Sequence, residues 1–191
     1  MILLFCGLSG AGKSTLSEAV RQRLTRMAVP VEVLDGDEYR SRMFTDLGFS
    51  RQHRIENLRR LGFIADKFAA HGIVTIISAI SPYEEARREL AERYPDVKVI
   101  FVDCGLDELR RRDTKGLYSL AALPEGSPEK LTCLSGVNDP FQPPASPDLH
   151  VNTQHTSIDD CCGQLCDYVL RHVRKIGREI GRQREGLRHA E

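Results

Sequence analysis

The chain has 191 residues, a length typical of one domain around one hydrophobic core. Its 27 basic side chains balance 27 acidic ones, which argues against a global charge that would recruit nucleic acid or an anionic membrane. The apolar run at residues 1–6 is too short for a signal peptide or a membrane span, so we expect a cytoplasmic protein with its six cysteines as thiols.

Short apolar segments alternate with longer amphipathic ones, and this alternation predicts an α/β fold with a mostly parallel sheet. We expect a single domain over residues 1–191, in which a five-stranded sheet is flanked by helices on both faces. The predicted strands are 2–6, 31–35, 73–79, 97–103 and 149–152. The predicted helices are 13–27, 51–71, 82–93, 106–112 and about 156–184, followed by a basic tail to residue 191.

Residues 114–147 do not fit this alternation, because glycines and prolines punctuate them throughout. Connections of this length in a compact domain are usually functional or disordered, and we expect a lid over a site. Three cysteines, Cys161, Cys162 and Cys166, lack a second ligand pair at zinc-finger spacing, which favours packing on the last helix.

A phosphate-binding loop follows the first predicted strand. The segment Gly7-Leu-Ser-Gly-Ala-Gly-Lys-Ser-Thr15 matches the Walker A pattern, and a predicted helix leaves it, as the motif requires. Backbone N–H groups and the helix N-terminus then surround the β-phosphate of ATP. We expect Lys13 to reach the β- and γ-phosphates and Ser14 to bind Mg²⁺. The ATP-binding residues are Gly7, Ser9, Gly10, Ala11, Gly12, Lys13, Ser14 and Thr15.

Two carboxylates end the second predicted strand, in Leu34-Asp-Gly-Asp37. Ligands of an open α/β sheet bind at the carboxyl ends of its strands, so both aspartates are expected beside the phosphate loop. Asp37 is our candidate for the base that accepts a hydroxyl proton, and Asp35 for a metal ligand. Asp as a helix N-cap for residues 38–46 is the alternative interpretation.

Together these motifs resemble the adenylylsulfate kinase family, a group of P-loop kinases that phosphorylate the 3′-hydroxyl of adenylyl sulfate (APS) to give PAPS. The resemblance covers about residues 2–153. Beyond the two motifs above, it rests on Asp46-Leu-Gly-Phe-Ser50, Arg54-Ile-Glu-Asn57, Ile80-Ser-Pro-Tyr83, Arg112-Asp-Thr-Lys-Gly-Leu-Tyr118 and Gly136-Val-Asn-Asp-Pro-Phe141.

The resemblance implies roles for further residues, and it implies a homodimer. Arg40, Arg54 and Asn57 would hold the phosphosulfate, and Phe49 would pack on the substrate adenine. Lys115, at the base of the lid, would act in catalysis with Lys13 and Asp37. The substrate-binding set is Asp37, Arg40, Phe49, Arg54, Asn57, Ile80, Ser81, Lys115 and Leu134. Without the resemblance, the residues themselves would favour an exposed helix face for Arg54 and a core position for Phe49.

The lid departs from the family pattern. Leu134 stands where the family has a phenylalanine that stacks on adenine, Thr132 replaces a lysine, and residues 119–123 carry no charge. These changes leave a second hypothesis open, in which the acceptor is another nucleotide, such as a nucleoside diphosphoramidate. A third hypothesis, a nucleotide-binding switch without an acceptor, lacks the guanine-reading motif of such switches.

Overall fold

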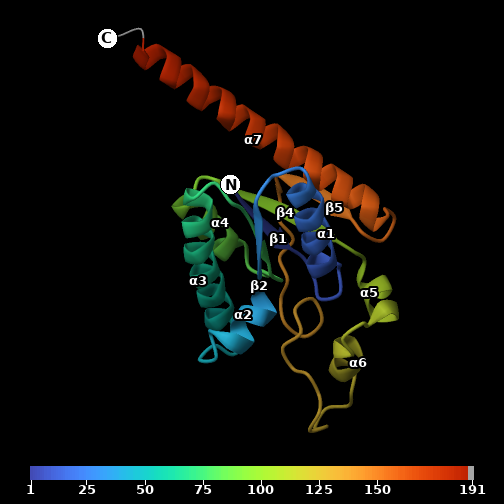
Figure 1. The fold of residues 1–191 in the computed structure, drawn as a ribbon. Helices are drawn as coiled ribbons and strands as arrows, with labels where there is room; N and C mark the ends of the chain where they lie inside the picture. Colours follow the sequence, from blue (N-terminus) through green and yellow to red (C-terminus); the bar gives the residue numbers. More distant parts are fainter. Residues whose placement is uncertain (189–191) are drawn as a thin grey trace.

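The computed structural model describes the backbone of residues 1–188 and the side chains through residue 173. Five parallel strands form one sheet in the order β2-β3-β1-β4-β5 (Figure 1). The strands are β1 (Ile2–Cys6), β2 (Val31–Asp35), β3 (Val74–Ser78), β4 (Val97–Asp103) and β5 (Leu149–Asn152). The α/β prediction is confirmed, and all five strands lie within one residue of their predicted bounds.

Helices cover both faces of the sheet (Figure 1). They are α1 (Lys13–Arg26), α2 (Gly36–Arg42), α3 (Arg51–Ala70), α4 (Glu84–Arg93), α5 (Leu106–Arg112), α6 (Leu117–Ala121) and α7 (Ile158–Arg188). The short helices α2 and α6 were missed as separate predictions, although the N-cap alternative anticipated a helix after Asp35. The predicted basic tail falls largely on residues whose side chains lie outside the described part.

The two faces of the sheet have separate cores because side chains alternate along each strand. Leu3 and Phe5 of β1 face α1 and α7, whereas Ile2 and Leu4 face α3 and α4. The three cysteines of α7 lie fully buried in the first core, with the Cys162 and Cys166 sulfurs 3.9 Å apart. Their predicted packing role is confirmed.

The carboxyl ends of β1, β2 and β3 meet at one edge of the sheet. In register, Asp35 of β2 and Phe5 of β1 both pair with Ser78 of β3. The phosphate loop follows β1 directly, so the topology alone brings this loop, Asp35 and Ser78 together. Within the described residues, no helix is both long and apolar enough to cross a membrane.

Candidate active site

Glycines give the phosphate loop its shape, through close backbone packing at Gly7 and a left-handed backbone at Gly12. A Cβ on Gly7 would lie 2.1 Å from the Val102 carbonyl oxygen, and Gly12, the N-cap of α1, has a φ of 92°. Neighbouring elements also hold the loop's carbonyls. The Tyr118 hydroxyl donates to the Ser9 carbonyl at 2.8 Å, and the Thr153 hydroxyl donates to the Ala11 carbonyl at 2.9 Å.

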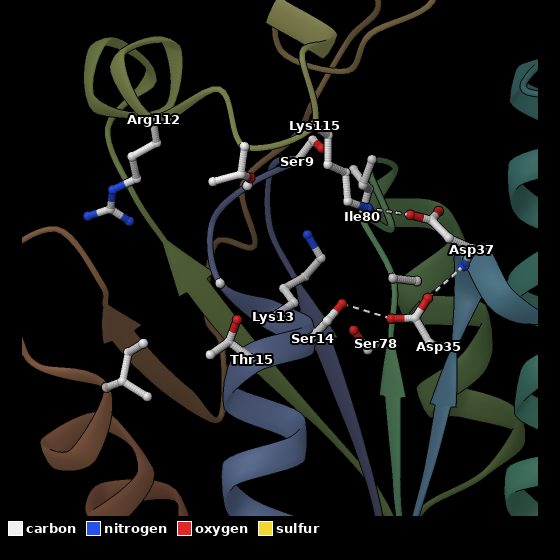
Figure 2. A pocket seen from close by; sticks show the side chains of 15 residues that line it. Ser9, Lys13, Ser14, Thr15, Asp35, Asp37, Ser78, Ile80, Arg112 and Lys115 are labelled. Carbon is white, nitrogen blue, oxygen red and sulfur yellow. Dashed lines mark hydrogen bonds and ion pairs between the residues drawn. The ribbon is translucent and has the colours of Figure 1, made fainter.

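Lys13 lies at the centre of the resulting cavity, folded back on its own loop (Figure 2). Its ammonium donates to the carbonyls of Gly7 and Leu8, at 2.8 Å each. Burial lowers the pKa of Lys13 to about 8, although the charge of Asp37 acts in the opposite direction. Both carbonyl contacts are replaceable by phosphate oxygens, which suits a lysine that binds a triphosphate.

Oxygen ligands for a divalent cation gather beside Lys13. The Ser14 hydroxyl donates to the Asp35 carboxylate at 2.8 Å, and the buried Ser78 hydroxyl, which lines the same cavity, has no hydrogen-bond partner (Figure 2). Hydroxyl and carboxylate oxygens are the ligands that Mg²⁺ prefers, with phosphate oxygens and water completing its shell. The residues present therefore fit Mg²⁺.

Asp35 also caps helix α2, so the N-cap alternative is confirmed, while its role as a metal ligand stays a prediction. Its carboxylate accepts hydrogen bonds from the backbone N–H of Asp37 at 2.9 Å and of Glu38 at 3.3 Å. This capping turns the chain sharply after β2. As a result, Asp37 comes to lie on the cavity wall across from the phosphate loop.

Asp37 forms an ion pair with Lys115, with 2.7 Å between its carboxylate and the ammonium (Figure 2). Burial acts to raise the pKa of Asp37, but the hydrogen bond and charge of Lys115, together with Lys13, outweigh it and hold this pKa below its usual range. The same contact raises the pKa of Lys115. Asp37 is therefore ionised at neutral pH.

Two cavities meet at this ion pair. The first, of about 270 Å³, lies over the phosphate loop, and the second, of about 480 Å³, lies between α2, α3 and the segment 114–147. Asp37, Lys115, Ser9 and Ile80 line both. The second cavity is more apolar, with Leu117, Leu131 and Leu134 on the side of the segment 114–147.

Phe49 and two arginines form one wall of the second cavity. Phe49 is half exposed, and the guanidinium carbons of Arg40 and Arg54 lie 4.9 Å and 5.6 Å from its ring centre. Arg54 is nearly buried and donates to the Phe49 carbonyl at 2.9 Å and the Cys133 carbonyl at 2.7 Å. The alternatives of an exposed helix face for Arg54 and a core position for Phe49 are therefore wrong, because Arg54 is not exposed and Phe49 is not in the core.

Two buried polar atoms without a hydrogen-bond partner lie in a recess next to this wall. The side-chain oxygens of Asn57 and Ser81 are buried without a hydrogen-bond partner, and both residues line a recess next to Phe49. Such atoms cost free energy unless something bonds them. The recess therefore offers two polar atoms that are free to bond water or a polar group of a ligand.

The structure brings most of the predicted site residues together. Ser9, Gly10, Gly12, Lys13, Ser14 and Thr15 line the first cavity, whereas Gly7 and Ala11 lie behind the loop and shape it. The residues predicted to bind the substrate line the second cavity or its recess, and these are Asp37, Arg40, Phe49, Arg54, Asn57, Ile80, Ser81, Lys115 and Leu134.

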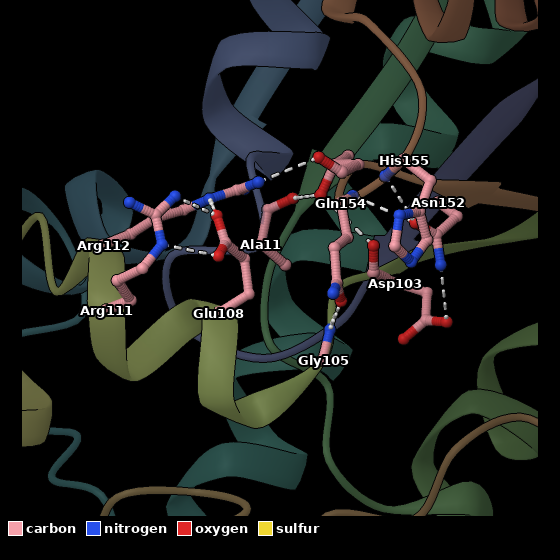
Figure 3. Close-up of polar contacts among 10 residues, drawn as sticks. Ala11, Asp103, Gly105, Glu108, Arg111, Arg112, Asn152, Gln154 and His155 are labelled. Carbon is pink, nitrogen blue, oxygen red and sulfur yellow. Dashed lines mark hydrogen bonds and ion pairs between the residues drawn. The ribbon is translucent and has the colours of Figure 1, made fainter.

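Sequence reasoning missed the outer end of the first cavity, which Arg112, Thr114 and Ile158 line. Arg112 bonds the Glu108 carboxylate at 2.7 Å and the Thr153 carbonyl at 3.0 Å, so its guanidinium is fixed in place (Figure 3). Its position in the sequence, three residues before the predicted site residue Lys115, could have indicated that Arg112 lies near the site.

The family model for adenylylsulphate kinase matches residues 1–152. The chain belongs to the adenylylsulphate kinase family. It is similar to the adenylyl-sulfate kinase of Myxococcus xanthus, with 47% identity over 181 residues and 92% of each chain covered. The adenylyl-sulfate kinase of Chloroflexus aurantiacus is 42% identical over 165 residues, with 86% of each chain covered.

Among solved structures, the chain is similar to the APS kinase CysC of Mycobacterium tuberculosis in complex with AMPPNP and APS. The TM-score is 0.81 and the identity 36%, and the match covers 88% of this chain and 96% of that one. The family resemblance drawn from the motifs is confirmed. An adenylylsulphate kinase is a phosphotransferase that acts on a hydroxyl group, in agreement with the paired cavities.

Proposed function

We propose that this adenylylsulphate kinase transfers the γ-phosphoryl group of ATP to the 3′-hydroxyl of adenylyl sulfate, giving ADP and 3′-phosphoadenylyl sulfate. The observation that carries the proposal is the junction of the two cavities at Asp37 and Lys115. A donor phosphate and an acceptor hydroxyl bound in adjoining cavities would meet beside one carboxylate and one ammonium. Phosphoryl transfer depends largely on such positioning and on charge stabilisation.

The donor side binds the triphosphate through the loop amides and Lys13. Lys13 would exchange its two carbonyl contacts for phosphate oxygens and hold charge that develops during transfer. Ser14 and Asp35 would hold Mg²⁺, which when bound neutralises charge on the β- and γ-phosphates. Arg112 and Ile158 would lie against the nucleoside end of ATP.

The acceptor side would hold a flat base and a dianionic group. Phe49 offers an exposed aromatic face, and Leu117, Leu131 and Leu134 add aliphatic side chains to the same cavity. Arg40 and Arg54 offer guanidinium groups that suit tetrahedral anions such as the phosphosulfate. Asn57 and Ser81 offer the unpaired oxygens of the recess.

Asp37 would accept the proton of the 3′-hydroxyl. Its pKa is low while Lys115 is paired with it, and a carboxylate with a low pKa is a weak base. If Lys115 turns towards the phosphates of bound ATP, the pKa of Asp37 rises towards its usual value. Nucleotide binding would in this way release the base at the time when it is needed.

We also propose that residues 114–147 act as a lid. The segment carries Lys115 at one end and the leucines of the acceptor cavity further along, so its position affects both cavities. Limited proteolysis with and without a non-hydrolysable ATP analogue plus APS tests this. We expect protection of the segment with ligand, and equal cleavage would contradict the lid.

An acceptor screen with coupled ADP detection tests the function itself. We expect saturable ADP release with micromolar APS, and a product that carries the new phosphate on the 3′ position. Nucleotides that lack the sulfate, and nucleoside diphosphoramidates, serve as competing acceptors. No turnover above background with APS, or a clear preference for another nucleotide, would overturn the proposal.

A homodimer, implied by the resemblance, remains a proposal. An APS kinase of Thiobacillus denitrificans, 28% identical with a TM-score of 0.65, is described as hexameric, and the match covers 29% of that chain. Light scattering after size exclusion should give twice the chain mass, and any other multiple would contradict a dimer. The cytoplasmic location likewise stays a prediction.

A further inference from the structure

A buried arginine lies beside the acceptor cavity without lining it. Arg87 on α4 is only 1% exposed and heads the fully buried side chains by size. A guanidinium taken out of water is costly unless hydrogen bonds and charge compensate it. The neighbouring Arg88 shows the contrast, since 70% of its side chain is exposed.

Arg87 binds two segments that are distant in sequence. Its guanidinium donates to the Ser81 carbonyl, in the loop after β3, and to the Gln142 carbonyl, at the far end of the segment 114–147. It also pairs with Glu84 on its own helix. Arg87 thus connects the loop after β3 to the returning end of the proposed lid.

Gln142 strengthens the same connection. Its backbone N–H donates to the Pro82 carbonyl at 2.8 Å, and its side-chain oxygen accepts from the Glu84 backbone N–H at 2.8 Å. The loop, the start of α4 and residue 142 therefore form one hydrogen-bonded unit around the buried guanidinium.

The loop held by Arg87 carries two residues predicted to bind the acceptor, Ile80 and Ser81, and Ser81 has a strained backbone. Ser81 has a φ of 48°, in the left-handed region that non-glycine residues rarely adopt. Its hydroxyl is buried and unpaired, and it lines the recess next to Asn57. The preceding Ile80 accepts a hydrogen bond from the Gly7 N–H at 3.2 Å, so the loop also contacts the phosphate loop.

We propose that Arg87 is a positioning residue for the acceptor. It holds Ser81 in the left-handed conformation that aims the free hydroxyl into the recess, and it fixes the end of the lid to the same loop. The identity of the acceptor rests on the proposed function, whereas the holding of the loop does not. Loss of Arg87 therefore impairs acceptor binding more than ATP binding.

Steady-state kinetics of Arg87→Met, beside the exposed control Arg88→Met, test this proposal. Losing hydrogen bonds from a buried charge predicts an APS KM raised about tenfold or more, with the ATP KM within about twofold of the wild type. Arg87→Lys retains the charge without the planar fork of the guanidinium. Its APS KM should therefore be intermediate between those of the wild type and Arg87→Met. An unchanged APS KM in Arg87→Met, or equal rises in both KM values, would overturn the proposal. If Arg87→Met fails to fold, Arg87→Lys decides alone, with an APS KM equal to the wild type counting against it.

Hydrogen–deuterium exchange of the enzyme without substrate tests whether Arg87 holds the loop and the end of the lid, whatever the acceptor is. We expect peptides covering residues 80–84 and 140–144 to exchange faster in Arg87→Met, and peptides of β1 and α1 to stay as in the wild type. Unchanged exchange in both peptides would refute the connection. If the wild type instead fails to phosphorylate APS, the proposed function fails while the exchange result still stands.

Discussion

The phosphate cavity and the acceptor cavity share Asp37 and Lys115 but are built differently. The first is built around one continuous loop at residues 7–15, whose carbonyls are tied to Tyr118 and Thr153. The second is mostly side chains, from α2, α3, the loop after β3 and the segment 114–147. Changes in the first should therefore affect the chemical step, and changes in the second the choice and affinity of the acceptor.

The largest expected effect is on the phosphate side. Lys13→Met keeps much of the side-chain volume but removes the ammonium, so kcat should fall by about a hundredfold to a thousandfold. The APS KM should change little, because Lys13 does not line the acceptor cavity. Steady-state kinetics measure kcat and the APS KM. A rise in the APS KM without a fall in kcat would contradict the division of roles between the two cavities.

The pH dependence of nucleotide affinity provides a second test. Burial lowers the pKa of Lys13 to about 8, so its charge is lost as the pH rises through this value. The phosphates of ADP bind the charged form more tightly, and affinity should fall as the pH rises above 8, by at most about tenfold per pH unit. Calorimetry from pH 7 to 10 measures this fall. In Lys13→Met the affinity should be lower throughout and lack this dependence, and an identical profile would contradict the assignment.

The double role of Asp35 predicts two separable losses. Asp35→Asn keeps an acceptor for the α2 N-cap but removes the charge, so the Mg²⁺ concentration for half-maximal activity should rise while Tm stays close to wild type. Asp35→Ala removes the cap acceptor as well as the charge, so it should be less stable than Asp35→Asn by ~1 kcal/mol. Thermal melts and Mg²⁺ titrations decide, and equal melting temperatures in the two variants would exclude the capping role.

The smallest expected effect comes from the acceptor wall. Leu134→Phe adds a second aromatic ring to the cavity that Phe49 lines, and stacking on the substrate base worth about 1 kcal/mol should lower the APS KM about fivefold. Leu120→Phe, on α6 outside the cavity, is the matched control. A raised APS KM in Leu134→Phe would show that the side chain, only 4% exposed, has no room to grow.

The difference between a cavity built on one local loop and a cavity assembled from distant segments also explains what the sequence could predict. The sheet and the phosphate loop follow from local patterns, because apolar runs and glycines act within a few residues. The contacts of Arg54 and Arg87 could not be foreseen, since their partners Cys133 and Gln142 lie 79 and 55 residues away. Helix α6 is short enough that its five residues carry no period of their own.

The ion pair of Asp37 and Lys115 was also invisible in the sequence. Each residue was expected in the site from its motif, but their contact joins residues 78 positions apart. Its distance of 2.7 Å depends on how the segment 114–147 folds back over the phosphate loop. Long-range side-chain contacts of this kind need the tertiary structure.

Single-turnover phosphoryl transfer by Asp37→Asn tests the central claim most directly, because this carboxylate lies where the two cavities meet. With saturating ATP and APS, we expect the rate of 3′-phosphorylation to fall about a hundredfold or more, while ADP affinity stays within a fewfold of the wild type. An undiminished transfer rate would contradict Asp37 as the group that receives the hydroxyl proton.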